Sequence, residues 1–149
     1  MYEQVTSELS SKKYDIAIMA AAVSDFKLNQ VNKKKIRSRG CDKITLDLFP
    51  TKKIINYIKL VDKNIFLVGF TAYHDVSNSF LISRANEKLK ESSSDIIIAN
   101  DVGRKYSTIG SDYNEVFIIS KNKPVVHLLP ERKDLIAKKI YEIIASYLE

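Results

Sequence analysis

The chain has 149 residues, of which 45% are hydrophobic and 28% charged, and its formal net charge is +6 at pH 7. This composition is typical of a globular protein, so we expect residues 1–149 to form one domain. No apolar run approaches the roughly 20 residues that span a bilayer, and residues 1–13 lack the apolar core of a signal peptide. We therefore expect a cytoplasmic protein without membrane contact.

The single cysteine, Cys41, excludes an internal disulfide and a metal site built from several cysteines. His74 and His127 are isolated from other ligand-type residues, so we read both as non-functional. The positive net charge favours an anionic partner, such as a nucleotide, a phosphorylated metabolite or a nucleic acid.

Hydrophobic periodicity predicts alternating helices and strands along the chain. A helix over residues 2–13 precedes an apolar strand over 15–23. The alternation of Ile44, Leu46 and Leu48 predicts a strand over 43–48, and Pro50-Thr51 is expected to end that strand and cap the next helix. The later predicted elements are a helix with a stripe of Ile54, Ile55, Ile58 and Val61, a strand over 65–70, a helix marked by Phe80, Leu81, Ala85 and Leu89, strands over 95–99, 115–120 and 125–129, and a helix from Glu131 onward.

The order strand, helix, strand, helix, strand predicts a parallel sheet with right-handed crossovers. The strand ends at Asp25, Phe70 and Asn100 should then lie at one edge of that sheet. The last two strands flank a short turn and predict an antiparallel hairpin. We therefore expect an α/β fold, a three-layer Rossmann-like domain with a mainly parallel sheet and a C-terminal antiparallel hairpin.

Two neighbouring segments are the strongest functional signal. The run Ala20-Ala21-Ala22-Val23-Ser24-Asp25-Phe26 ends an apolar strand in small residues, and Lys33-Lys34-Lys35-Ile36-Arg37-Ser38-Arg39 places five cations within seven residues. Open α/β sheets bind ligands at the carboxyl ends of their strands, and clustered cations can meet a polyphosphate there. The pair predicts a nucleotide site, although a basic run by itself is more often only solvated.

Five motifs in order resemble the phosphopantothenoylcysteine synthetase domain, usually the carboxyl-terminal half of a bifunctional coenzyme A biosynthesis flavoprotein. The first is the alanine-rich run 20–26, which resembles that family's strand motif. Lys35-Ile36-Arg37-Ser38 falls where the family has a basic loop. The remaining three are Pro50-Thr51-Lys52 at a helix start, Val68-Gly69-Phe70 at a strand end, and Ala99-Asn100-Asp101-Val102.

The resemblance implies CTP-dependent ligation of 4'-phosphopantothenate to L-cysteine through an acyl-cytidylate, with Mg²⁺. It makes Lys35 the essential lysine of a mobile loop. The nucleotide contacts that it implies are Met19, Ala20, Ala21, Asp25, Lys35, Arg37, Phe49, Pro50, Thr51, Lys52, Phe70 and Lys88. The substrate contacts that it implies are Ala22, Asn100 and Asp101.

This sequence departs from the family pattern in four respects. Arg37 and Ser38 stand where the family loop has lysines, Ser92 matches its second helical lysine, and Tyr73 replaces an acidic residue. The family domain begins with a strand and a glycine-rich turn that precede the part matched here. The resemblance therefore implies that this chain lacks the amino-terminal third of the domain, and activity of the isolated chain does not follow. The flavin-binding half is absent too, and we expect no FMN on this chain.

The resemblance also implies a homodimer in which an arm around residues 24–48 is exchanged near the partner's site, and association with a phosphopantothenoylcysteine decarboxylase. Two other functions stay open. One is a non-catalytic nucleotide-binding or assembly module. The other is a basic nucleic-acid-binding domain, although neither zinc-finger spacing nor an aromatic-rich ribonucleoprotein motif accompanies the basic run.

Overall fold

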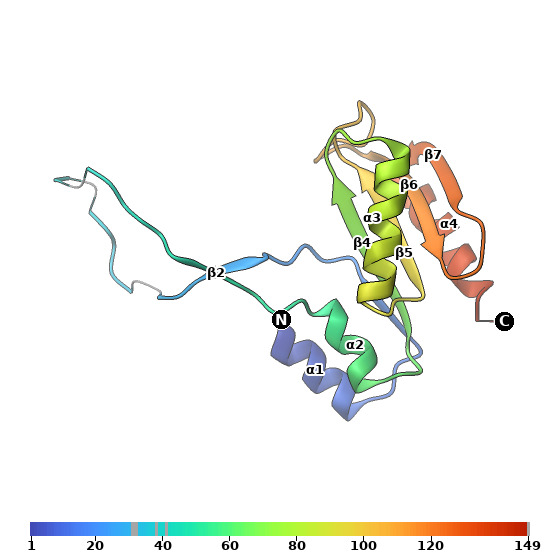
Figure 1. Cartoon of the computed structure of the whole chain (residues 1–149), viewed down its shortest axis with the longest axis horizontal. Coiled ribbons are helices and arrows are strands. Elements are labelled where there is room, and N and C mark those ends of the chain that lie inside the picture. The colour runs from blue at the N-terminus through green and yellow to red at the C-terminus, as the bar shows by residue number, and fades with distance from the viewer. Residues whose placement is uncertain (31–32, 38, 41, 149) are drawn as a thin grey trace.

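The computed structural model describes residues 1–30, 33–37, 39–40 and 42–148. Figure 1 shows a body of helices around a sheet, from which a long arm extends to one side. Ser38 and Cys41 lie outside the described residues, so the predictions for them have no structural outcome.

A five-stranded sheet with the order β1-β4-β5-β6-β7 forms the centre of the body. Its strands are β1 (Ile16–Met19), β4 (Phe66–Tyr73), β5 (Ile96–Asp101), β6 (Tyr113–Ser120) and β7 (Val126–Arg132). β1, β4 and β5 are parallel to one another, whereas β6 and β7 run antiparallel to their neighbours. The predicted α/β fold with a C-terminal antiparallel hairpin is confirmed.

Helices cover the two faces of the sheet unequally. α1 (Tyr2–Ser11) and α2 (Ile55–Val61) pack together against β1 and β4, and α3 (Asn78–Glu91) covers β5 and β6 on the same face. α4 (Lys133–Ala145) packs on the opposite face against Val68, Ile98 and Ile118. Figure 1 shows α3 and α4 on opposite sides of the sheet.

The core explains why the helix predictions succeeded. Leu81, Ala85 and Leu89 occur at helical spacing on α3, and all three are buried. Burial of each leucine contributes about 1.5–3 kcal/mol relative to an exposed position. Gly69 lets α2 approach β4, because a β-carbon there would lie 2.6 Å from the Ile55 side chain.

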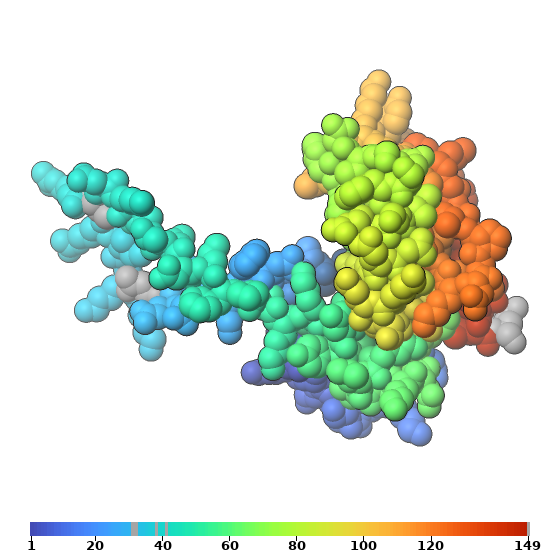
Figure 2. All heavy atoms as spheres, in the orientation of Figure 1, coloured from blue at the N-terminus to red at the C-terminus, as the bar shows by residue number. Residues whose placement is uncertain are grey.

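The arm corrects the prediction for residues 43–48. Residues 43–47 form no strand, and only Leu48 of the predicted range belongs to β3 (Leu48–Pro50), which pairs antiparallel with β2 (Phe26–Leu28) in a separate two-stranded ribbon. The alternation of Ile44 and Leu46 indicates extended chain, but both side chains are exposed and pack on no sheet. Figure 2 shows the arm standing clear of the body.

Several element ends also differ from prediction. β4 continues to Tyr73 instead of ending at Phe70, and β7 continues to Arg132, so the last helix begins at Lys133 rather than Glu131. β1 ends at Met19 rather than Val23, because the chain turns from the sheet toward the arm there. α2 begins at Ile55, and Thr51 does not cap it. Instead the Thr51 hydroxyl donates to the carbonyl oxygen of Ser24 at 2.7 Å, which joins the outgoing and returning segments of the arm at its base.

Within the described part of the chain, no helix is both long enough and apolar enough to cross a bilayer.

Candidate functional site

A cavity of 560 Å³ lies where β1 ends, between the start of α2 and the face of α3. This volume is within the range of small-molecule sites, about 300–1,000 Å³. The cavity is at the carboxyl edge of the parallel strands, where α/β sheets bind ligands. Met19, Ala21, Ala22 and Val23 form the wall next to β1. The small side chains of Ala21 and Ala22 allow a ligand to approach the backbone there.

An ion pair stands at the mouth of the cavity. Lys53 Nζ lies 2.5 Å from Asp25 Oδ1, and both side chains are exposed. The hydrogen bond from Lys53 lowers the pKa of Asp25 from its ordinary value of 3.8. Asp25 is therefore ionised at neutral pH, and its backbone oxygen also accepts a hydrogen bond from the Thr51 amide at 2.8 Å.

The wall formed by α3 carries two cations, Arg84 and Lys88. They are four residues apart, so they lie on one face of the helix. Lys88 Nζ donates to the carbonyl oxygen of Phe70 at 2.7 Å. Burial, reinforced by the nearby Lys53, lowers the pKa of Lys88 from 10.5.

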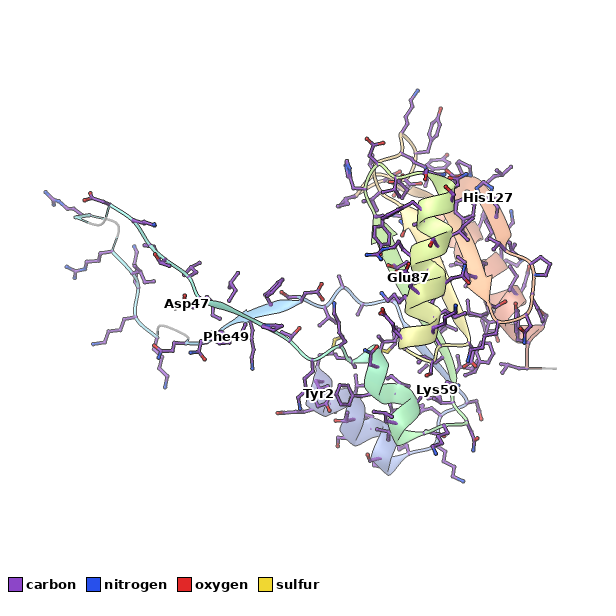
Figure 3. The ribbon with its side chains drawn as sticks, in the orientation of Figure 1. Tyr2, Asp47, Phe49, Lys59, Glu87 and His127 are labelled. Atoms are coloured by element: carbon purple, nitrogen blue, oxygen red, sulfur yellow. The ribbon has the colours of Figure 1, made fainter. Side chains whose placement is uncertain are left out.

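Arg84 forms an ion pair with Glu87 on the same helix. Its guanidinium lies 2.6 Å from a Glu87 carboxylate oxygen, and that charge raises the pKa of Arg84. Figure 3 labels Glu87 on α3, on the side of the helix toward the arm. The lining thus combines cations that can meet phosphate with carboxylates that can meet a metal or a hydroxyl.

The structure brings together eight of the side chains predicted from the sequence. Those that line the cavity are Met19, Ala21, Ala22, Asp25, Thr51, Lys52, Phe70 and Lys88. Lys52 also lies over the Tyr2 ring, with Nζ 4.7 Å from the ring centroid. The other predicted residues, Ala20, Lys35, Arg37, Phe49, Pro50, Asn100 and Asp101, are not among the cavity-lining residues.

Lys35, Arg37 and Phe49 belong to the arm, away from the cavity of their own chain. All three are exposed, and Figure 3 shows Phe49 on the arm at a distance from Glu87 on the body. Within one chain, therefore, the basic loop does not lie over the cavity. The predicted phosphate contact of Lys35 needs either movement of the arm or a second subunit.

Asp101 is 3% exposed and holds two loops together. Its Oδ1 accepts hydrogen bonds from the amides of Asp75 and Gly103, both at 2.8 Å, and its Oδ2 accepts one from Val76 at 3.0 Å. Burial opposes ionisation, but these bonds together lower the pKa of Asp101 below 3.8. The adjacent Asn100 donates to the side-chain oxygen of Asn114 at 3.3 Å.

A polar network extends from Asp101 to β7. Arg104 lies 2.7 Å from Glu115, which in turn lies 2.7 Å from His127 Nε2. Burial works against ionisation of Glu115, but hydrogen bonds from Arg104 and His127 lower its pKa overall. His127 also stacks on Phe117, with ring centroids 4.1 Å apart. These contacts give His127 a role in packing β6 against β7.

Sequence reasoning missed Lys53 and Arg84. The signal for Arg84 was its position four residues before Lys88, which places it on the cavity side of α3. The resemblance put Ser92 where the family has a second helical lysine. Ser92 is buried at the C-cap of α3, and its hydroxyl donates to the carbonyl oxygen of Lys88 at 2.7 Å.

Among the described residues, no group of three or more His, Cys, Asp or Glu side chains is arranged to hold a metal ion. Of the carboxylates that line the cavity, Glu87 and Glu91 are four residues apart on α3, whereas Asp25 comes from the chain between β1 and β2. Mg²⁺ commonly enters enzyme sites on substrate phosphates with only one or two protein carboxylates. The donor set therefore fits a magnesium–nucleotide complex better than a permanent metal centre.

Comparison with protein families matches residues 1–148 to the model described as "DNA/pantothenate metabolism flavoprotein C-terminal domain". The Coenzyme A biosynthesis bifunctional protein CoaBC of Thermococcus kodakarensis is 38% identical over 122 residues. That alignment covers 82% of this chain but only 29% of the relative, so the chain spans less than a third of that protein.

Solved structures share the fold. The DNA/pantothenate metabolism flavoprotein from Streptococcus pneumoniae superposes with a TM-score of 0.73 at 27% identity, covering 97% of this chain and 69% of that one. A Cab2 mutant solved in complex with phosphopantothenate-cysteine superposes with a TM-score of 0.60 at 20% identity. The second match covers 83% of this chain and 42% of the other.

Proposed function

Because the chain belongs to the family of the DNA/pantothenate metabolism flavoprotein C-terminal domain, we propose that it is the nucleotide-binding part of a phosphopantothenate–cysteine ligase. The reaction joins 4'-phosphopantothenate to L-cysteine at the expense of CTP, in coenzyme A biosynthesis. The observation that carries this proposal is the cavity at the end of β1, with a small-residue wall on one side and the cations of α3 on the other.

We place the triphosphate of CTP against α3. The half-buried ammonium of Lys88 has already lost part of its hydration, so its attraction to an anion is less screened than that of a surface lysine. Arg84 adds a planar guanidinium that can bind two phosphate oxygens at once. The ribose and base then lie along Met19–Val23, where small side chains allow backbone contacts, with Asp25 and Phe70 beside them.

Two steps complete the reaction. A carboxylate oxygen of phosphopantothenate attacks the α-phosphorus of CTP; the bond to the β-phosphate oxygen breaks, and pyrophosphate leaves. The cysteine amine then attacks the acyl carbon, loses a proton, and expels CMP as an amide forms. Fixed cations and the Mg²⁺ that accompanies CTP stabilise the negative charge that gathers in the first transition state.

Phosphopantothenate and cysteine are proposed as the other two substrates. The Cab2 neighbour was solved with phosphopantothenate-cysteine, which supports the same product here. Ala22 lines the cavity and is retained as a contact to the acyl group. Asn100 is retained as a second contact. Asp101 is assigned instead to the loops that surround the site, because backbone amides already occupy both of its oxygens.

Lys35 and Arg37 act in this proposal from a neighbouring subunit. The arm that carries them leaves the cavity of its own chain and exposes a series of apolar side chains. Exposed apolar residues on an extended ribbon favour contact with another protein surface. A homodimer with exchanged arms would cover these residues and bring Lys35 to the partner's cavity. We also retain association with a decarboxylase as part of the proposal.

A non-catalytic nucleotide-binding module is the second candidate. It is favoured by the separation of the arm from the cavity, because the α3 cations could bind a nucleotide without any contribution from Lys35. The two candidates differ in turnover. A ligase releases pyrophosphate from CTP when phosphopantothenate is present, whereas the module binds CTP and releases no pyrophosphate.

Isothermal titration with CTP and Mg²⁺ tests the nucleotide site. We expect Lys88→Met to weaken CTP binding by about tenfold to a hundredfold, the loss that one hydrogen bond to a charged group implies. Lys90→Met is the matched control, since Lys90 is exposed on the same helix and does not line the cavity. Equal affinities of the Lys88→Met variant and the unsubstituted chain would contradict the proposal.

A further inference from the structure

Tyr73 ends β4 at the carboxyl edge of the sheet and lines the cavity, but it has no role in the proposed reaction so far. Its backbone oxygen accepts a hydrogen bond from the Val102 amide at 2.8 Å, and its ring packs against the core beneath α3. The Tyr73 side chain is therefore held in place on the cavity wall. The family pattern has an acidic residue at this position, so it does not supply a tyrosine contact.

A set of contacts joins Tyr73 to Arg84 on the same wall. The rings of Tyr73 and Phe80 meet edge to face, with centroids 5.7 Å apart and planes at 88°. The Arg84 guanidinium lies over the Phe80 ring, with Cζ 5.7 Å from the centroid. The charge of Glu87 and a hydrogen bond to the Tyr73 hydroxyl raise the pKa of Arg84. A guanidinium has five N–H donors, so these contacts leave donors for a phosphate.

The charge of the cavity explains why a neutral partner for Arg84 matters. Among the described residues, four cationic and three carboxylate side chains line the cavity, which leaves one net positive charge. Glu87 already pairs with Arg84, but both side chains are about half exposed, and exposed pairs of this kind are weak. A nucleotide phosphate can therefore displace Glu87. A second carboxylate at position 73 would remove the net positive charge, whereas the Tyr73 hydroxyl holds the guanidinium without neutralising it.

The strand register shows where Arg84 lies relative to the end of β1. Lys88 donates to the carbonyl oxygen of Phe70, which follows the β4 residue that pairs with Met19. Lys88 is therefore level with the end of β1. Arg84 lies beside Tyr73, farther along β4, and is about one helical turn from Lys88, which is about 5.4 Å along the helix axis. With the nucleoside at the end of β1, Lys88 meets the phosphates next to the ribose, and Arg84 meets those farther out.

We propose that Tyr73 is a positioning residue, which with the Phe80 ring holds the Arg84 guanidinium against the phosphates that distinguish a nucleoside triphosphate from a monophosphate. The proposal rests on the proposed function, because it concerns the nucleotide in the same cavity. It adds a determinant of specificity to that site. Lys88 contributes to the binding of CTP and CMP, whereas Tyr73 and Arg84 contribute to the binding of CTP alone. The site thereby prefers CTP to the CMP that the reaction releases.

Removal of the Tyr73 hydroxyl tests this role. Tyr73→Phe keeps the ring and its contact with Phe80, but it cannot accept the hydrogen bond from Arg84. We expect it to weaken the binding of CTP with Mg²⁺ by about threefold to tenfold, the loss that one neutral hydrogen bond implies, and to leave CMP binding nearly unchanged. Isothermal titration measures both affinities. An unchanged affinity for CTP, or equal losses for CTP and CMP, would overturn the proposal.

A double-mutant cycle shows whether Tyr73 acts through Arg84. Arg84→Met should weaken CTP binding by about tenfold, with little effect on CMP. In the Arg84→Met background, Tyr73→Phe should cause no further loss, because the hydroxyl then has no guanidinium to hold. Tyr141→Phe is the matched control, since Tyr141 is 65% exposed on α4 and does not line this cavity. Additive losses, or an equal loss with Tyr141→Phe, would contradict the positioning role.

The same titrations separate a failure of this role from a failure of the proposed function. If the unsubstituted chain binds no CTP, the proposed function fails, and Tyr73 has no phosphate to act on. If CTP binds and Lys88→Met weakens it, but Tyr73→Phe and Arg84→Met do not, the nucleotide site stands and only the positioning role is lost. A lower melting temperature of Tyr73→Phe, together with equal losses for CTP and CMP, would mean that Tyr73 only supports the fold.

Discussion

Lys88 lines the proposed nucleotide site, and its buried charge also lowers the stability of the fold. Burial lowers its pKa below 10.5, so the unfolded chain binds this proton more tightly than the folded chain does. By linkage, the free energy of unfolding rises with pH through the folded pKa of Lys88 and up to its ordinary value. We predict that Lys88→Met removes part of that alkaline rise, as measured by urea unfolding over a pH series. An unchanged pH dependence would contradict this account of Lys88.

At neutral pH Asp101 stabilises the fold, whereas the buried ammonium of Lys88 destabilises it. The folded pKa of Asp101 is below 3.8, so its contribution to stability is present above that pH and is lost as the pH falls through the folded pKa. Asp101→Asn replaces one acceptor oxygen with a donor that faces backbone amides. We predict a loss of about 2–3 kcal/mol in the free energy of unfolding at neutral pH, measured by urea denaturation. A stable variant with impaired substrate binding would instead favour the substrate contact implied by the resemblance.

These two residues also show what could be foreseen at the residue scale. The order of the motifs indicated three residues that line the cavity, Asp25, Phe70 and Lys88. Asp25 and Phe70 belong to motifs at predicted strand ends, and Lys88 lies on a predicted helix. The sequence did not show that amides from two distant loops occupy the Asp101 carboxylate, since that depends on the contact between residues 75–76 and Gly103. Arg84 could have been found from its helical spacing with Lys88.

At the scale of elements, periodicity predicted the buried helices and strands well and the arm poorly. Leu81, Ala85 and Leu89 recur at helical spacing because one side of α3 packs against the core. Their spacing in the sequence therefore predicts the helix. In the described part of the chain, Ile44 and Leu46 face no such core, and Leu48 pairs only with Leu28 of the exposed ribbon. A pattern of period two indicates extended backbone, but it does not say what the apolar side contacts.

The arm makes a separate prediction. Ile44 and Leu46 are 52% and 59% exposed, so Ile44→Asp with Leu46→Asp should leave the melting temperature of the isolated subunit unchanged. In the proposed homodimer the same pair is covered by the partner, and the substitutions should produce monomers. Light scattering coupled to size exclusion measures the mass, and Leu60→Asp on α2 is the control. A dimer that survives the double substitution would mean that the arms do not form the interface.

At the scale of the whole molecule, parallel topology determines where the site lies. Right-handed crossovers place the ends of β1, β4 and β5 at one edge of the sheet, which could be predicted from the order of elements alone. Which helix covers each face could not, because an apolar stripe shows that one side of a helix is buried but not which surface it contacts.

Mixed dimers test whether Lys35 acts on the partner's cavity. If it does, Lys35→Ala and Lys88→Met homodimers should both bind CTP weakly. Subunits exchanged between the two variants should regain a fraction of sites with normal affinity, because one site of each mixed dimer then combines an intact arm with an intact cavity. Titration calorimetry before and after exchange measures this, and no recovery would show that Lys35 does not act across subunits.

The most direct measurement is a crystal structure of the chain grown with CTP and Mg²⁺. We predict the triphosphate beside Arg84 and Lys88 of α3, with the ribose and base along Met19–Val23 at the end of β1. A nucleotide bound elsewhere, or an empty cavity at saturating CTP, would contradict the claim that this cavity is the nucleotide site.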